Sequence, residues 1–232
     1  METPTLDALG RGFYTVAEAA RLTRVDRSTI RRWLKGYEYS AKDGRRSSPP
    51  VWRSEYADAE AGPALGFRDL IEVRFVAAFR QHGVAWGTIR LSATRAAEMI
   101  ETSHPFSTRR FKTDGHRIFA DFAQSTGDPR LIELARGQHA FRQVIAPSLY
   151  AGLEWSSEDD AVRWWPIPGR KVVVIDPRRS FGRPIVNAGS VPTGVLASAV
   201  RAEKSIEYVA SLYEVPVGSV REAVAFEKSL AA

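Results

Sequence analysis

YTVAEAARLTRVDRSTIRRWLK, at residues 14–35, predicts two short helices joined by a tight turn. Thr15 is a favourable N-cap for the first helix, and Glu18 three residues later completes a capping box. Asp26 is placed to cap the second helix. Gly36 is expected to end it, because glycine adopts the left-handed conformation at low cost. The fold at this end of the chain is therefore set by local signals.

The second of these helices has one apolar side and one basic side. Ile30, Trp33 and Leu34 follow the i, i+3, i+4 spacing and are expected to face inward. The outward positions are Arg27, Ser28, Arg31, Arg32 and Lys35. A helix fits the DNA major groove, and arginine can donate two hydrogen bonds to a guanine edge. The pattern predicts a DNA-recognition helix, with a helical hairpin that has a solvated basic face as the alternative.

A basic hairpin is predicted directly after this helix, in YEYSAKDGRRSSPPVWRSEY at residues 37–56. Asp43-Gly44 is a strong tight-turn signal. We interpret the segment as a wing that touches the DNA backbone or minor groove. A flexible polar loop is the alternative, given the run Ser47-Ser48-Pro49-Pro50.

These two elements supply the candidate DNA-binding residues. The base-edge candidates, near the start of the recognition helix, are Arg27, Ser28 and Arg31. The phosphate-binding candidates are Arg32, Lys35, Lys42, Arg45 and Arg46. One short helix reads few bases, so we expect the head to bind operator DNA as part of a homodimer.

Composition and charge agree with a nucleic-acid partner. The 232 residues are 44% hydrophobic and 26% charged, as in a globular protein with a core. Residues 21–53 hold ten Lys or Arg and three Asp or Glu, a net charge of +7 against +6 for the whole chain. A charge concentrated in this way indicates a polyanion site.

Other features exclude several classes of protein. The absence of cysteine excludes disulfides, zinc–thiolate sites and thiol nucleophiles. No apolar run approaches the length of a membrane span, and METPTLDALGRG at the N-terminus is no secretion signal. We expect a cytoplasmic protein with no membrane partner.

The order of helix, helix, basic hairpin and a further helix pair at residues 65–99, with the wording TVAEAARLTRVDRSTIRRW, resembles the head of MerR-family regulators. The resemblance implies a winged helix-turn-helix. The chain departs from that family later, because it has no long heptad segment for a coiled coil and lacks the cysteines of the metal-sensing members.

A second hairpin is predicted in the middle region, near residues 109–122, around the Asp114-Gly115 turn. Phe111 and Ile118 would then share an apolar face, and Lys112 would lie opposite Arg117. Like charges in that position suit a solvated edge, or alternatively a bound anion.

The tail segment SIEYVASLYEVPVGSVREAV, residues 205–224, overlays the head without a gap. The positions that match the basic outward face are Val217, Gly218, Arg221, Glu222 and Ala225. One Arg beside one Glu will not hold a phosphate backbone. The pattern predicts a helix-turn-helix shape used for protein contact or folding. The alternative is that any two capped helices would overlay equally well.

The preceding residues 172–200 carry a second resemblance. A strand ends at Asp176-Pro177, and the turns Gly182-Arg183-Pro184-Ile185 and Gly189-Ser190-Val191-Pro192 follow. With the tail helices, this resembles the small C-terminal module, a domain of unknown function, of VapB-type antitoxins. That family usually has Arg at or beside the position of Val191. The resemblance implies a PIN-type ribonuclease toxin as partner. The candidate toxin or dimer contacts are Phe181, Val191, Tyr213, Val217 and Phe226.

Catalytic patterns are not evident. The four histidines lack metal-site spacing, and neither a phosphate loop nor a nucleophile elbow appears. The acidic run Glu158-Asp159-Asp160 suits a solvated loop better than a two-metal site. We expect no enzyme activity, cofactor or metal.

These observations predict a mainly α fold with small β elements. Residues 1–60 would form the winged helix-turn-helix head, 61–160 a helical middle with the hairpin, and 161–232 a strand followed by three helices. The predicted function is a DNA-binding antitoxin that neutralises its toxin and represses its own promoter. A stand-alone MerR-like regulator responding to a small molecule is the first alternative, and an interaction protein with no DNA role is the second.

Overall fold

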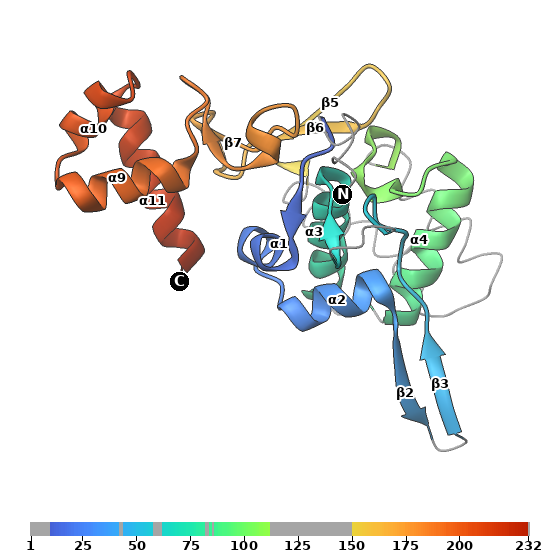
Figure 1. Cartoon of the computed structure of the whole chain (residues 1–232). Coiled ribbons are helices and arrows are strands. Elements are labelled where there is room, and N and C mark those ends of the chain that lie inside the picture. Colours follow the sequence, from blue (N-terminus) through green and yellow to red (C-terminus); the bar gives the residue numbers. More distant parts are fainter. Residues whose placement is uncertain are drawn as a thin grey trace, which may run out of the picture. The chain divides into compact units, whose positions relative to one another are not determined.

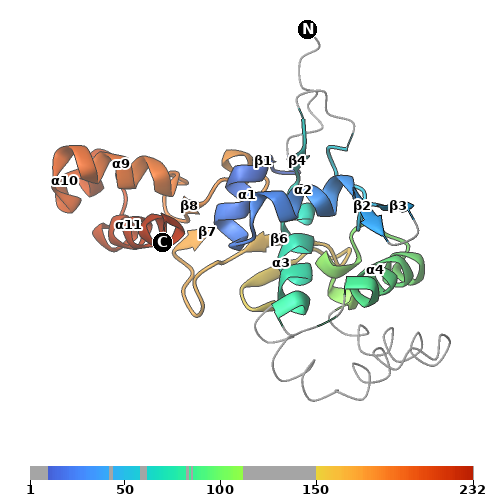
Figure 2. The same cartoon turned by 90° about the horizontal axis from the view of Figure 1, so that it is seen from below.

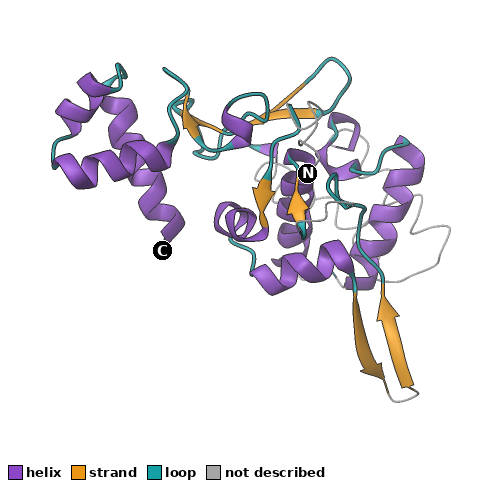
Figure 3. Cartoon of the chain, in the orientation of Figure 1, coloured by secondary structure: helices purple, strands orange, loops and turns teal. Residues whose placement is uncertain are grey.

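The computed structural model describes residues 10–41, 44–57, 62–81, 84, 86–111 and 150–231. The chain divides into two compact units, which we call the head unit and the tail unit. The head unit comprises residues 15–150 and 155–161, and the tail unit comprises Met1–Tyr14, Ala151–Glu154 and Val162–Ala232. The described part is mainly helical, with small strand pairs, as predicted (Figure 3). The predicted three-part division of the chain stays a prediction.

Helices dominate both units. The elements of the head unit are α1 (Val16–Thr23), α2 (Arg27–Lys35), β2 (Tyr37–Ala41), β3 (Gly44–Ser48), β4 (Ala64–Leu65), α3 (Phe67–Gln81), α4 (Trp86–Ile100) and η2 (Pro105–Ser107). Those of the tail unit are β7 (Val173–Val174), η4 (Ser180–Gly182), β8 (Ile185–Val186), α9 (Thr193–Glu203), α10 (Ile206–Leu212) and α11 (Val217–Ala231). Strands β1 (Tyr14–Thr15), β5 (Leu153–Trp155) and β6 (Ala161–Trp164) include residues of both units.

The predicted capping of α1 and α2 is confirmed. The Thr15 hydroxyl accepts from the Glu18 backbone N–H at 3.2 Å, and the Glu18 carboxylate accepts from the Thr15 N–H at 2.8 Å. Arg24 ends α1 in the left-handed conformation, and Asp26 accepts from the Ser28 N–H at 2.8 Å. Helix α1 contacts both α2 and α3 (Figure 2). The ends of the two helices are therefore fixed by local caps, and the helix-turn-helix packs against α3.

The core of the head unit is built around α3, which is buried over most of its surface. Phe75 is fully buried, and its ring stacks on that of Phe106 at a centroid distance of 5.9 Å. Phe111 and Tyr150 contact Phe75 edge-on at 6.3 and 5.0 Å. Such offset and edge-to-face pairs add to the gain from burying the rings. This aromatic cluster joins α3 to the segments around η2.

A buried carboxylate on the same helix joins α3 to the segment that follows the wing. Asp69 is fully buried. Its partners are Trp52 Nε1 at 2.7 Å, Ser54 Oγ at 2.8 Å, Glu55 N at 3.0 Å, Gly66 N at 2.8 Å and His104 Nε2 at 2.8 Å. A buried carboxylate is tolerated only when hydrogen bonds replace its lost hydration. The Asp69 network therefore fixes the end of the wing segment against α3.

A second buried carboxylate, Glu72, makes the stability of the head unit depend on pH. Burial raises the pKa of Glu72 from 4.5 to about 8, although the charge of His104 and a hydrogen bond from the Ser107 N–H at 2.9 Å oppose that rise. For His104, burial acts most strongly and favours the neutral ring, yet the hydrogen bond to Asp69 and nearby carboxylates leave its pKa raised above 6.5. Both groups bind protons more tightly in the folded state.

This gives a pH prediction. Between pH 4.5 and about 8 the folded state retains a proton on Glu72 that the unfolded chain has lost, so the free energy of unfolding falls as pH rises through that window. The stabilisation contributed by His104 is fully present below its unfolded pKa of 6.5 and is lost as pH rises through its folded pKa. We expect Glu72→Gln to flatten the fall and to stabilise the protein at pH 8 by more than about 1 kcal/mol. Thermal melts of the wild type and of Glu72→Gln across this pH window measure the effect, with the exposed Glu38→Gln as the control. If the stability of Glu72→Gln depends on pH as that of the control does, the prediction is contradicted.

The hairpin predicted near residues 109–122 falls mostly outside the described residues, which stop at Phe111 and resume at Tyr150. At its start the prediction is wrong, because residues 109–111 are helical. The Thr108 hydroxyl accepts from the Phe111 N–H at 3.1 Å, which is the geometry of a helix cap. The side chain of Phe111 is fully buried and belongs to the aromatic cluster.

The tail unit has the predicted strand followed by three helices (Figure 1). Strands β7 and β8 are antiparallel, with Val173 opposite Val186 and Val174 opposite Ile185. The strand that was expected to end at Asp176-Pro177 ends at Val174 in the structure. The Ser205 hydroxyl caps α10 by accepting from the Tyr208 N–H at 3.1 Å. Helices α10 and α11 contact each other and α9 over a buried aliphatic cluster.

Candidate nucleic-acid interface

Helix α2 has the inward and outward faces that its sequence predicts. Ile30, Trp33 and Leu34 are buried in the head unit. The outward residues are all exposed, namely Arg27, Ser28, Arg31, Arg32 and Lys35. The first group anchors the helix, so the second is presented on a fixed support.

Ser28 is partly used by the fold itself. Its hydroxyl donates to Asp26 Oδ1 at 2.5 Å, and its backbone N–H donates to the same oxygen at 2.8 Å. The hydroxyl bond is the main reason that the pKa of Asp26 is lowered. Ser28 can still accept a hydrogen bond, but its proton is engaged in the cap. The guanidinium groups of Arg27 and Arg31 are then the principal donors of the predicted base-reading set.

The predicted wing is a regular hairpin, and the loop alternative is excluded. Strands β2 and β3 pair from Tyr37 opposite Ser48 to Ala41 opposite Gly44 and project from the end of α2 (Figure 1). Gly44, which the Asp43-Gly44 signal assigns to the turn, is paired with Ala41 and begins β3 instead. Lys42, a predicted phosphate ligand, lies outside the described residues.

The described cations of the wing are exposed. Arg45 and Arg46 both lie on β3. Arg45 Nη1 is 3.7 Å from Glu38 Oε2 on the facing strand, and both side chains are largely exposed. An exposed ion pair of this length is worth little, so it costs little to exchange it for a phosphate contact. Arg45 and Arg46 are therefore exposed on the wing, where phosphate contacts are predicted.

Gly36 joins the recognition helix to the wing. It has φ +73° and ψ −175°, a conformation that only glycine adopts readily. A Cβ at this position would lie 2.3 Å from the Ser48 carbonyl oxygen. The returning chain is also fastened here, because the Val51 N–H donates to the Trp33 carbonyl at 2.9 Å. The direction of the wing is thus set at the end of α2.

We expect Gly36→Ala to displace the wing and to lower the free energy of unfolding by about 2–4 kcal/mol, from backbone strain plus the clash with a backbone oxygen. Gly87→Ala is the matched control, since a Cβ there meets nothing within 4 Å, and it should change stability by less than about 1 kcal/mol. Chemical denaturation of both variants measures this. Equal stabilities for the two variants would show that the junction is not constrained as described.

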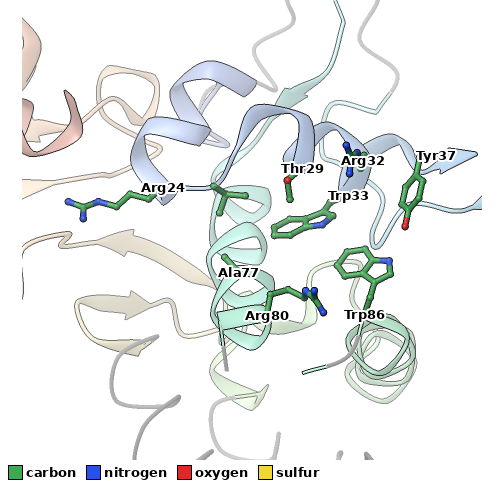
Figure 4. Close-up of a pocket in the computed structure, with 9 residues that line it drawn as sticks. Arg24, Thr29, Arg32, Trp33, Tyr37, Ala77, Arg80 and Trp86 are labelled. Carbon is green, nitrogen blue, oxygen red and sulfur yellow. The ribbon is translucent and has the colours of Figure 1, made fainter. Parts of the chain in front are cut away.

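A cavity of about 470 Å³ lies beside α2, between this helix and the facing parts of α3 and α4 (Figure 4). Its lining residues are Arg24, Val25, Thr29, Arg32, Trp33, Tyr37, Ala77, Arg80 and Trp86. The rings of Trp33 and Trp86 stack at a centroid distance of 5.7 Å and an interplanar angle of 21°. The Arg32 guanidinium lies 6.0 Å from the centre of the Tyr37 ring. Three arginines and three aromatic rings thus surround a hollow that adjoins the recognition helix.

Three of the lining residues, Arg24, Arg80 and Trp86, were not predicted to form part of a site. Arg80 lies on α3 and donates to the Val84 carbonyl at 2.9 Å, and Trp86 begins α4. Their approach to α2 depends on how three helices pack, for which the local sequence carries no signal. Arg24 stands in the turn, where its positive charge could have been noticed.

The candidate partner contacts in the tail unit fall into three groups. Phe181 and Val217 are exposed, with 58% and 36% of their surface accessible. Val191 and Tyr213 are partly buried against the tail core. Phe226 is 6% exposed, so the prediction that it forms part of a contact surface is corrected. It lies on the inward face of α11 with Val220 and Ala223, as its spacing from them allows. Exposed Tyr208 and Leu212 on α10 were not predicted.

Among the described residues, no group of three or more His, Cys, Asp or Glu side chains is arranged to hold a metal ion. Of the helices that the structure describes, none combines the length and apolarity needed to cross a membrane.

Comparison with known proteins agrees with the helix-turn-helix assignment. Residues 12–93 match the protein-family model described as "Putative DNA-binding HTH domain". The match includes α1, α2 and the wing, and continues through α3 into α4. It therefore contains all the described residues that line the cavity.

A relative and a solved structure extend the comparison to the whole chain. The chain is 28% identical over 227 residues to a protein of Mycobacterium tuberculosis named "Putative antitoxin VapB45", covering 91% of this chain and 92% of that protein. The fold of this chain is similar to that in the crystal structure of Rv2018 from Mycobacterium tuberculosis. The TM-score is 0.64, and the identity is 22% over 91% of this chain and 96% of the other. The similarity thus includes both the head and the tail of the chain.

Proposed function

We propose that this protein is a DNA-binding antitoxin of a bacterial type II toxin–antitoxin pair. The observation that carries the DNA-binding part is the exposed basic face of α2 beside a wing fixed at Gly36. The major groove admits such a helix, and the wing would contact the adjacent backbone or minor groove. In this proposal Arg27 and Arg31 contact base edges, while Arg32, Lys35, Arg45 and Arg46 bind phosphate, together with Lys42.

The antitoxin part of the proposal is supported by the relative named as an antitoxin, whose similarity extends over nearly the full length of both chains. The proposed partner is a PIN-type ribonuclease toxin, which the tail unit would occupy. The head would bind operator DNA in the protein's own promoter as part of a homodimer and so repress transcription. In this role the chain itself performs no catalysis.

The toxin part is tested by expressing any nuclease that is encoded beside this gene, with and without the full-length protein. We expect a stoichiometric complex on size-exclusion chromatography and loss of RNA cleavage in the mixture. Unchanged cleavage in the presence of excess protein would reject this part. The absence of a neighbouring nuclease gene would also count against it.

The cavity beside α2 favours a second candidate function, a regulator that responds to a small molecule. Its volume of about 470 Å³ lies within the usual range for ligand sites, and its arginines and rings suit a planar anion. Tryptophan fluorescence reports on it directly, because Trp33 and Trp86 both line the cavity. Titration with a panel of aromatic carboxylates and nucleotides should quench that fluorescence and shift operator affinity if this candidate is correct. If no compound does both, the first proposal stands alone.

A further inference from the structure

Two phenylalanines stand exposed together on the tail unit. Phe181 is 58% and Phe13 is 44% accessible, and the Phe13 N–H donates to the Phe181 carbonyl at 3.0 Å. They are far apart in sequence, so only the fold brings them together. We call this pair, with the loop of residues 180–183, the aromatic clasp.

Hydrogen bonds and close packing within the tail unit fix the loop of the clasp. The hydroxyl of Tyr14, a side chain that is 2% exposed, donates to the Gly182 carbonyl at 2.8 Å. Gly182 is packed so closely that a Cβ would lie 2.3 Å from that hydroxyl. On the other side, Arg179 donates to Asn187 Oδ1 at 2.9 Å and to Ser190 Oγ at 2.6 Å. The loop is thereby fixed before any partner arrives.

The exposed ring of Phe181 is also presented on a strained backbone. Ser180, Phe181 and Gly182 have φ values of +48°, +55° and +79°. The left-handed conformation is unfavourable for a bulky residue, and such strain tends to be retained at functional positions. Because more than half of the Phe181 surface is accessible, burial of this side chain offsets the backbone strain only in part. Its position is consistent with selection for binding.

We infer that the aromatic clasp is a docking surface for an acidic protein partner. Arg178 and Arg183 flank Phe181 in the sequence, and both are exposed. An aromatic centre with an arginine rim has the composition of an interaction hot spot. The rim is positive, so the complementary surface would offer an apolar pocket bordered by Asp and Glu. In the proposed function this partner is the toxin, and that identification rests on the proposed function.

Charge argues against the two other occupants. A symmetric contact with a second copy would set Arg178 and Arg183 against the same residues of that copy, which is repulsive. Two exposed arginines would release few counterions from a nucleic acid, in contrast to the cations gathered on α2 and the wing. An acidic protein surface satisfies both the rings and the rim.

Photocrosslinking of the full-length protein in its native host tests the inference. One variant carries p-benzoylphenylalanine in place of Phe181, and the matched control carries it in place of Tyr208, which is 54% exposed on the same unit. We expect the Phe181 variant to capture one protein, identified by mass spectrometry, whose crosslinked peptide lies in an acidic patch. Crosslinks to a second copy, to nucleic acid or at no more than the control level would overturn the inference.

The affinity of the identified partner for purified full-length variants then measures how much the Phe181 ring and the flanking arginines contribute. Phe181→Ala should weaken binding at least about tenfold, and Arg183→Glu should slow association most at low salt. Tyr208→Ala should bind as the wild type does, and circular dichroism checks that every variant is folded. Equal affinities for Phe181→Ala and wild type would overturn the inference. If the captured partner is acidic but has no nuclease activity, the docking surface is supported and the identification of the partner as a toxin is rejected. If a nuclease is captured only from position 208, the toxin partner is supported and the docking surface at the clasp is rejected.

Discussion

Replacing Arg27 and Arg31 together with alanine should weaken operator binding by about 2–6 kcal/mol, because each base-reading arginine contributes about 1–3 kcal/mol. Both side chains are exposed on α2, and they are the main donors left after the Ser28 hydroxyl is engaged with Asp26. Affinity for unrelated DNA should fall much less than affinity for the operator. Fluorescence anisotropy with labelled operator and shuffled duplexes measures both values.

The tail unit supplies the matched control for this experiment. Arg221 occupies, in the α10–α11 pair, the position that Arg31 occupies in the α1–α2 pair, and it is also exposed. Arg221→Ala should therefore leave operator affinity unchanged. Arg31→Ala with Arg32→Ala should in addition make the salt dependence shallower by about one counterion, since Arg32 is assigned to phosphate. If neither double variant loses affinity, the chain is an interaction protein with no DNA role.

The second large effect is expected on stability. Asp69→Ala should lower the free energy of unfolding by about 3–5 kcal/mol, because it leaves the buried His104, the Trp52 indole N–H and two backbone N–H groups without their acceptor. Asp69→Asn keeps the side-chain volume but accepts fewer hydrogen bonds. Its free energy of unfolding should therefore lie between those of Asp69→Ala and the wild type. Urea denaturation followed by tryptophan fluorescence measures the series.

The exposed Glu38 of the wing is a suitable control, since it pairs only weakly with Arg45 at 3.7 Å. Glu38→Ala should change stability by less than about 0.5 kcal/mol. A loss below about 1 kcal/mol for Asp69→Ala would mean that the network does not hold the wing segment to α3.

Local signals predicted the head well. Thr15, Glu18 and Asp26 cap α1 and α2 within a few residues, so their effect could be read from the sequence alone. The wing was predicted from the same kind of signal, but Gly44, which was expected in the turn, lies in β3. The tight-turn dipeptide does not specify the register, whereas the pairing of Ala41 with Gly44 does.

Longer-range features could not be predicted from the sequence. Asp69 has partners up to 35 residues away, and the cavity depends on the mutual packing of α2, α3 and α4. Phe226 was assigned to a contact surface, although its spacing from Val220 and Ala223 is compatible with the inward face that it occupies. Residues 109–111 were expected to be extended, yet the Thr108 cap starts a helix there. Partners distant in sequence decided the outcome for Asp69 and the cavity, and a competing local cap decided it for residues 109–111.

The most direct test of the central claim is the affinity of the full-length protein for its own promoter DNA, measured against a shuffled duplex over a range of salt concentrations. A DNA-binding antitoxin should prefer the promoter by about a thousandfold or more, and its affinity for both duplexes should fall steeply as salt increases. Equal affinity for the two duplexes, or no binding at low salt, would contradict the proposed function.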